Sequence, residues 1–224
     1  MIAFGSKHPE FIRNYLERTG PRQMRQKPFD MTRIVALDTE ATGFEIGRDR
    51  LLSVAVIEID WIDIQLETSF EWLVYQPNVV INKATEIHGI LPSDTLQGQP
   101  EKQMLQELLP RIAGSIVIGD QIWFDTLMLN DAFRRNYGIP FQNPTIDVGL
   151  MAMNELQAFR KTGYINQRPP SLEDLCAHFG LPLHDRHTAE GDAYIAAEIF
   201  LLMCGYIRQR KGQIAKRDLP IKKT

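Results

Sequence analysis

The chain has 224 residues, of which 44% are hydrophobic and 24% are charged, with a net charge of −3. These proportions fit an ordinary folded protein, and the length allows one domain with a sizeable core and short appendages. No stretch approaches the roughly 20 apolar residues of a membrane span. Residues 1–20 also lack the charged and then apolar pattern of a secretion signal. We therefore expect a cytoplasmic protein that makes no membrane contact.

The two ends of the chain are basic and its middle is acidic. Residues 1–35 hold seven Lys and Arg against three Asp and Glu, and residues 205–224 hold seven against one. One interpretation is that these ends only keep the protein soluble. The other is that they contact nucleic-acid phosphates while the acidic middle binds metal.

The first half of the chain predicts an N-terminal extension and then an antiparallel meander. In the extension, residues 1–30, the stretch 9–18 has one apolar side, as a short helix would, and the stretch 20–30 is loop-like. Strand-like runs follow, and the connection between the last two allows only a tight hairpin. These runs are residues 33–40, 51–62 and 64–75.

Beyond Pro100 the apolar residues recur with the period of a helix, and short strands alternate with helices. Pro110 predicts a kink or an end in the first of these helices, and Asp147 is a suitable N-cap for the third. The predicted helices are residues 104–112, 124–137, 148–159, 171–180 and 188–210, and the predicted strands are residues 115–118 and 145–146. This order predicts an α/β domain over residues 31–210, with helices on both faces of a mixed five-stranded sheet, and a basic C-terminal tail at residues 211–224.

The cysteines do not indicate redox or zinc chemistry. Cys176 and Cys204 lie in apolar helical stretches without CxxC or Cys/His spacing, so we expect buried free thiols. A zinc site built from His184, Asp185 and His187 is a weaker alternative, because the ligand spacing is poor and no distant partner is evident.

Two acidic residues, Asp38 and Glu40, follow the apolar run 34–37. In a strand their carboxylates project from the same face, where like charges repel unless a cation lies between them. Carboxylate oxygens suit Mg²⁺ or Mn²⁺. The pair therefore indicates a metal site, and the alternative is that Asp38 caps a turn while Glu40 is solvated.

Two more acids fall where such a fold can bring them towards this pair. Asp125 follows a predicted strand at the start of a helix, and Asp192 shares an apolar helix stripe with Ala196 and Ile199, where an acid needs a partner. Helix capping by Asp125 and a helix-dipole contact by Asp192 are the alternative explanations. His187 precedes Asp192 by five residues.

In chain order, three segments resemble the three exonuclease motifs of the DEDDh, or DnaQ-like, 3′→5′ exonucleases, which have a ribonuclease-H-like fold. They are Asp38-Thr-Glu-Ala-Thr-Gly43, Phe124-Asp125 with Leu127 and Leu129, and His187-Thr-Ala-Glu-Gly-Asp192. The segments Ala84-Thr-Glu-Ile-His-Gly-Ile90 and Ser171-Leu-Glu-Asp-Leu-Cys-Ala-His-Phe-Gly180 are also similar to linking segments of that family. Each segment alone is a weak signal, and all five in this order over residues 32–205 are highly specific.

The resemblance implies a site of four carboxylates that binds two Mg²⁺ or Mn²⁺ ions and hydrolyses phosphodiester bonds. Asp38 would contact both ions, Glu40 and Asp192 would hold the ion beside the attacking water, and Asp125 would hold the second. His187 would be the general base, because histidine changes its charge near neutral pH. Glu40 and His187 are thus the residues expected to act most directly in catalysis.

The resemblance also implies substrate contacts. The turn at Thr42 and Gly43 would let backbone amides approach the terminal nucleotide, and Phe44 would stack on the last base. His88 would lie on the substrate side of the site, with a purely structural histidine as the alternative.

One segment departs from the pattern of the family. Where many members read Ala-His-Asn-Ala before the Phe-Asp pair, this chain has Gly119-Asp120-Gln121-Ile122-Trp123. Asp120 would alter metal affinity or disfavour the terminal phosphate, whereas Trp123 would contact the substrate or fill the core. No expected metal ligand is lost.

The favoured substrate is a single-stranded or frayed 3′ end of DNA, because the His-Gly-Ile element is most similar to that of polymerase-associated proofreading exonucleases. A DNA polymerase is the partner that this similarity implies. An exoribonuclease on short RNA or RNA 3′ ends is the alternative enzyme, since contacts to the 2′-OH decide the sugar. A non-catalytic nucleic-acid-binding polymerase accessory module is the alternative from another class, and the presence of all four acids and the histidine argues against it.

Overall fold

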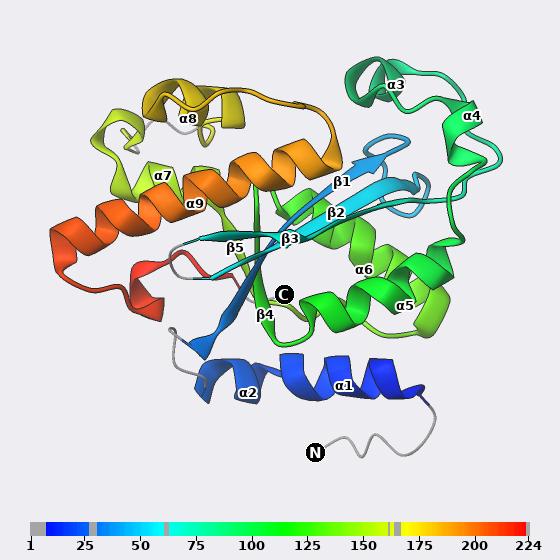
Figure 1. Ribbon diagram of the computed structural model, residues 1–224, viewed down its shortest axis with the longest axis horizontal. Coiled ribbons are helices and arrows are strands. Elements are labelled where there is room, and N and C mark those ends of the chain that lie inside the picture. The colour runs from blue at the N-terminus through cyan, green and yellow to red at the C-terminus, as the bar shows by residue number, and fades with distance from the viewer. Residues whose placement is uncertain (1–7, 27–30, 61–62, 161, 164–166, 223–224) are drawn as a thin grey trace.

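A computed structural model describes residues 8–26, 31–60, 63–160, 162–163 and 167–222 (Figure 1). Its sheet has the strand order β3-β2-β1-β4-β5. The first three strands pair antiparallel, and β4 and β5 continue the sheet in parallel with β1. The strands are β1 (Arg33–Ala41), β2 (Leu51–Ile59), β3 (Ile64–Leu73), β4 (Ser115–Gly119) and β5 (Thr145–Asp147). This is the predicted mixed five-stranded sheet, including its meander.

The central strand β1 is buried on both faces, which explains its uninterrupted apolar run. Val35 and Leu37 point into one hydrophobic cluster, and Ile34 and Ala36 point into a second cluster on the other face. Helices therefore cover both faces, as predicted. The first cluster is closed by α1 (Glu10–Thr19), α5 (Glu101–Ile112) and α6 (Trp123–Tyr137), and the second by α7 (Val148–Glu155), α8 (Leu172–Phe179) and α9 (Ala189–Lys211).

The N-terminal segment packs into the domain at the starts of β1 and β4 (Figure 1). In α1 the buried Tyr15 hydroxyl donates to Oδ1 of Asn143 at 2.9 Å. The loop prediction for residues 20–30 is wrong at α2 (Pro21–Gln26), and residues 27–30 lie outside the described part. Proline at the first helical position is preorganised for a helix, and burial of Met24 in the core adds a tertiary contact that local composition does not reveal.

The C-terminal segment also packs on the sheet. Leu219 is buried in the core, and Lys222 exchanges two backbone hydrogen bonds of 2.9 Å with Thr145, which extends the edge beside β5. The Lys216 ammonium donates to the carbonyl oxygen of Met24 at 2.6 Å, so the two basic ends of the chain meet.

One helix continues past a proline that was expected to kink or end it, and another stops before its predicted end. The helix α5 continues past Pro110 to Ile112, because complete burial of Leu109 and Ile112 offsets the backbone hydrogen bond that proline cannot donate. The helix predicted over residues 148–159 is interrupted at Leu156, which adopts an extended conformation before a short 3₁₀ helix, Gln157–Phe159.

Other local expectations are confirmed. Asp147 caps α7, its side chain accepting from the backbone N–H of Leu150. Cys176 and Cys204 are buried free thiols. None of the helices in the described residues is long and apolar enough to cross a membrane.

Candidate active site

A pocket of about 250 Å³ opens at the C-terminal end of β1. Its wall includes Asp38 and Glu40 from β1, Asp125 from α6, Asp192 from α9, and His187 from the loop before α9. Five residues singled out from three distant sequence motifs thus lie around one cavity.

The sheet topology leaves the two acids of β1 free of one neighbouring strand. The pairing between β1 and β4 ends at Ala36 opposite Ile118, two residues before Asp38. Beyond that point the chain leaves the sheet towards α6, which opens a gap beside Asp38 and Glu40. Such a gap at the carboxyl ends of strands is where open α/β sheets bind ligands.

Three of the carboxylates lie within reach of one cation. One oxygen each from Asp38, Glu40 and Asp192 lie within 4.8 Å of one another. Asp125 is outside this trio, but it lines the same pocket and is buried. The Thr39 hydroxyl donates to Oδ1 of Asp125 at 2.7 Å and so ties the second motif to the first.

Burial and mutual repulsion disfavour the ionised form of these acids. Burial, followed by Asp125, Asp192 and Glu40, raises the pKa of Asp38 well above its usual range. Burial raises the pKa of Glu40 to about 8, with Asp192 and Asp125 adding to the effect. Burial also raises the pKa of Asp125 to about 7, although the hydrogen bond from Thr39 acts to lower it. A divalent cation would relieve this repulsion, and an all-oxygen donor set fits Mg²⁺ or Mn²⁺.

These pKa directions predict how metal-free protein responds to pH. In the unfolded chain Asp and Glu titrate near about pH 4, whereas the folded pKa of Glu40 is about 8. The folded state therefore binds more protons between these values, and the free energy of unfolding falls as pH rises through that window. We expect melting curves in EDTA to lose about 4 °C or more between about pH 5 and pH 8.

Saturating Mg²⁺ should flatten this loss, because a bound cation favours the ionised carboxylates. Melting curves of the Asp38→Asn variant in EDTA provide the control, and they should show a smaller loss than the wild type because one repelling charge is gone. Equal pH dependence with and without Mg²⁺ would contradict a cation site at these carboxylates.

Two hydrogen bonds of Thr188 hold the loop that carries His187 against the start of α9. Thr188 caps the helix by accepting from the N–H of Gly191 at 3.1 Å, and it donates from its hydroxyl to the Asp185 carbonyl at 2.7 Å. A Cβ on Gly191 would lie 2.1 Å from that carbonyl oxygen, so only glycine fits. His187 has a left-handed φ of 65° and an exposed side chain at the pocket.

The candidate substrate residues are divided between two hollows. Gly43 and Phe44 line the site pocket, where Phe44 is 75% exposed and its ring centroid lies 5.4 Å from that of Phe124. Thr42 lines a neighbouring hollow instead, and its hydroxyl donates to Asp49 at 2.8 Å.

His88 also lines the site pocket, but it is buried and has a structural contact. Its Nδ1 accepts from the backbone N–H of Ile90 at 3.0 Å. Burial lowers the pKa of His88, which favours the neutral ring.

The departure in the second motif lies directly on the pocket wall. Burial, and then the nearby Asp147, raises the pKa of Asp120 to about 6. Gln121 has a left-handed φ of 43°. Trp123 is 55% exposed and meets Phe124 edge to face, so it belongs to the rim of the pocket and does not fill the core.

Sequence reasoning missed two residues that act on the acids. Thr39 stands between the first two acids, and the alternation of a strand gives no reason to connect it with Asp125. Arg186 precedes His187 and forms ion pairs with Asp192 and Glu173. A basic residue next to an acidic site was the available signal for Arg186.

Comparisons with known proteins show what the whole chain is similar to. The chain matches the RNase_T family, described as Exonuclease, over residues 35–200. It is 27% identical over 180 residues to the DNA polymerase III subunit epsilon of Aquifex aeolicus, covering 80% of this chain and 83% of that one. It is 24% identical over 178 residues to the subunit of the same name from Treponema pallidum, covering 79% of each chain.

Among solved structures, E. coli exonuclease I in complex with a dT13 oligonucleotide superposes with a TM-score of 0.66 at 18% sequence identity. The match covers 81% of this chain and 42% of the exonuclease I chain. The shared part is the α/β, ribonuclease-H-like fold.

Proposed function

The chain belongs to the RNase_T exonuclease family, and from this premise we propose that it is a metal-dependent enzyme that removes nucleotides from the 3′ end of DNA. The observation that carries the proposal is the trio of carboxylate oxygens within 4.8 Å, in a pocket that Asp125 and His187 also line. The names of its relatives, which are DNA polymerase III subunits, favour DNA as the substrate and a DNA polymerase as the partner.

The residues divide the proposed chemistry among them. Two divalent ions, when bound, supply positive charge that stabilises the attacking and leaving oxygens of phosphodiester hydrolysis. Asp38 would contribute to both ion sites, Glu40 and Asp192 to one, and Asp125 to the other. The exposed His187 would accept the proton of the attacking water at its ring nitrogen, a role that requires the neutral imidazole.

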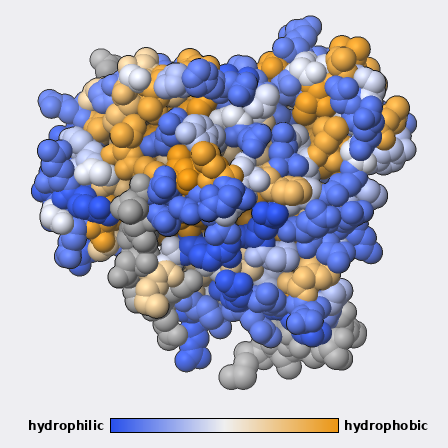
Figure 2. Space-filling view, in the orientation of Figure 1, coloured by the Kyte–Doolittle hydropathy of each residue, from blue (hydrophilic) through white to orange (hydrophobic). Residues whose placement is uncertain are grey.

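Exposed apolar side chains beside the carboxylates suit the bases of a single strand. Phe44 and Trp123 present aromatic rings at the pocket, and Ile87 of α3 (Lys83–His88) adds a side chain that is 51% exposed. Figure 2 shows hydrophobic and hydrophilic residues side by side at the end of the molecule that carries α3 and the following α4 (Pro92–Thr95). Any base can stack on such rings, whatever the nucleotide sequence. An enzyme that shortens 3′ ends of any sequence needs this tolerance.

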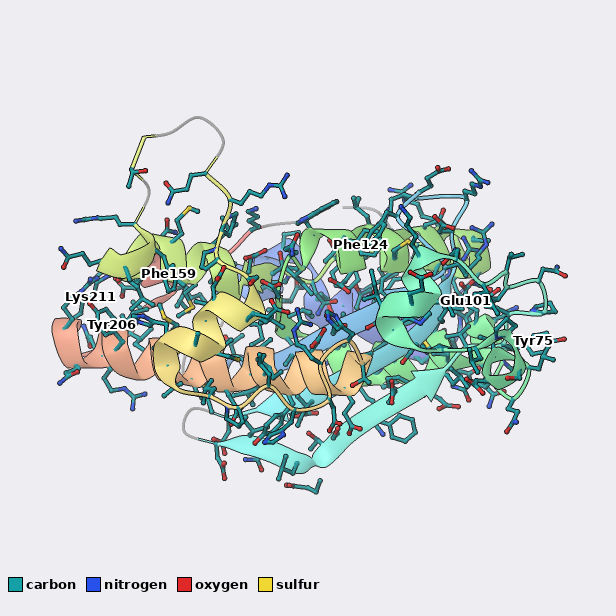
Figure 3. All side chains as sticks on the ribbon, turned by 90° about the horizontal axis from the view of Figure 1, so that it is seen from above. Tyr75, Glu101, Phe124, Phe159, Tyr206 and Lys211 are labelled. Atoms are coloured by element: carbon teal, nitrogen blue, oxygen red, sulfur yellow. The ribbon has the colours of Figure 1, made fainter. Side chains whose placement is uncertain are left out.

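Phe44→Ala is expected to raise KM for single-stranded DNA by about 5- to 150-fold, because each stacked base contributes about 1–3 kcal/mol. Steady-state kinetics on an oligonucleotide measure this. Tyr206→Ala is the matched control, since Tyr206 is an aromatic residue near the far end of α9 (Figure 3). Equal KM values for the two variants would remove Phe44 from the substrate site.

The proposed function is tested with 5′-labelled single-stranded DNA, duplex DNA with a mismatched 3′ end, and RNA of the same sequence, each with Mg²⁺ or Mn²⁺. We expect a ladder of DNA products that shorten from the 3′ end. Faster shortening of RNA would favour the exoribonuclease. Binding of DNA without shortening of any substrate would favour the accessory module.

A further inference from the structure

Arg186 forms a bridge between the candidate metal site and α8. One terminal nitrogen of its guanidinium pairs with Oδ2 of Asp192, and the other pairs with Oε1 of Glu173 at 2.6 Å. The Arg186 side chain is 19% exposed and that of Asp192 is 9% exposed, so their ion pair is largely removed from water. The guanidinium therefore occupies an oxygen of a residue that the proposed function assigns to metal.

The positive charge of Arg186 reaches beyond Asp192. It also acts on Asp38 and Glu40, where it opposes the repulsion among the acids. Arg186 thus offsets part of the repulsion among the acids, as a bound metal cation would. A charge with this role competes with a metal ion for the same carboxylates.

Two features favour release of the Arg186 guanidinium from Asp192. Its Nε is buried without a hydrogen-bond partner among the described residues, and an unmet buried donor makes the bridging position less stable than a fully satisfied one. Glu173 stands in the first turn of α8 with a side chain that is 44% exposed. It can hold the guanidinium at the surface after Asp192 is released.

We propose that Arg186 is a built-in counter-cation, which neutralises Asp192 in metal-free protein and, when the metal binds, releases Asp192 while it keeps its ion pair with Glu173. The inference rests on the proposed function, because it assigns Asp192 to the metal. Arg186 is then a positioning residue that sets the affinity of the site for metal and links metal occupancy to α8.

The proposal is tested by Mn²⁺ titration of the full chain, with free Mn²⁺ followed by electron paramagnetic resonance. Arg186→Gln removes the competing charge and should lower the Kd for Mn²⁺ by about tenfold. Glu173→Gln removes the other partner of Arg186 and should raise the Kd by about threefold or more. Opposite shifts are expected only if the guanidinium competes with metal.

Arg210→Gln is the matched control, because Arg210 forms an Arg–Glu ion pair with Glu155 near the other end of α9. Its Kd for Mn²⁺ should equal that of the wild type. Melting curves give a second readout: Mn²⁺ should raise the melting temperature of Arg186→Gln by more than it raises that of the wild type.

Weaker or unchanged Mn²⁺ binding by Arg186→Gln would overturn the proposal, since a residue that only orients Asp192 would lower affinity when removed. If Arg186→Gln does not fold, Glu173→Gln decides, and an unchanged Kd there would also overturn it. A wild type that binds no Mn²⁺ would overturn the proposed function together with this inference. Normal wild-type binding without the opposite shifts would overturn this inference alone.

Discussion

Asp38→Asn is expected to lower turnover by more than about a thousandfold, the scale on which removal of an electrostatic contact affects catalysis. Asparagine preserves the shape of the side chain but removes its charge. The Asp38 carboxylate is the one that Asp125, Asp192 and Glu40 all repel. The measurement is the initial rate of oligonucleotide shortening at saturating Mg²⁺. Mn²⁺ binding should weaken in parallel.

Asp131→Asn is the matched control for this variant, because Asp131 lies six residues along α6 from Asp125 and forms a surface ion pair with Arg135. Its turnover should stay near that of the wild type. If Asp38→Asn retains more than about a tenth of wild-type turnover, the carboxylate site is not the catalytic metal centre.

His187→Ala is expected to lower turnover by about 10²- to 10⁴-fold, the range for a positioned general base. Binding of Mn²⁺ and DNA should persist, because the His187 imidazole stands outside the trio of metal-facing oxygens. Initial rates of oligonucleotide shortening, together with a separate DNA-binding titration, measure these effects.

His184→Ala is the matched control, because His184 is an exposed histidine in the same loop that does not line the pocket. It should retain wild-type turnover. Equal losses in both variants would favour the zinc alternative, which uses the two histidines together. Rescue of His187→Ala by excess metal would make His187 a ligand and not the base.

Periodicity predicted most of the fold because each element satisfies its local rules. Ser171 and Gly180 bound α8 as a cap and a left-handed stop, at the two ends of the helix that the sequence predicted, and Thr188 caps α9. The helices α2, α3 and α4 escaped prediction. They span six, six and four residues, and so short a helix depends on tertiary contacts more than on propensity.

The candidate site was predictable as a set of residues but not as a geometry. Spacing placed Asp38 and Glu40 on one face, and the order of the predicted elements pointed to Asp125 and Asp192. The resemblance then assigned roles to these acids and to His187. Only the folded chain shows that Thr42 turns to a neighbouring hollow. Side-chain partners across the fold, such as Thr39 with Asp125, have no signature in local sequence, since 86 residues separate them.

The basic ends show the same limit of prediction. Their charge is plain in composition, but the contact of Lys216 with Met24 gathers them near the start of the sheet. The opposite end of β1 carries the acids. In Figure 3, Lys211 at the end of α9 is likewise well separated from Phe124 beside the pocket. A contact of these ends with phosphates would therefore lie away from the scissile bond.

The link between Thr39 and Asp125 also bears on how the chain acquires activity as it folds. Strands β1, β2 and β3 are consecutive and pair locally, whereas Asp125 and Asp192 join β1 only through contacts of long sequence separation. Such contacts form late, because the entropy of closing long loops opposes them. A chain in which only the meander has formed holds two of the four acids. During refolding, the proposed activity should therefore recover with the slowest structural phase, when the first turn of α9 docks beside β1.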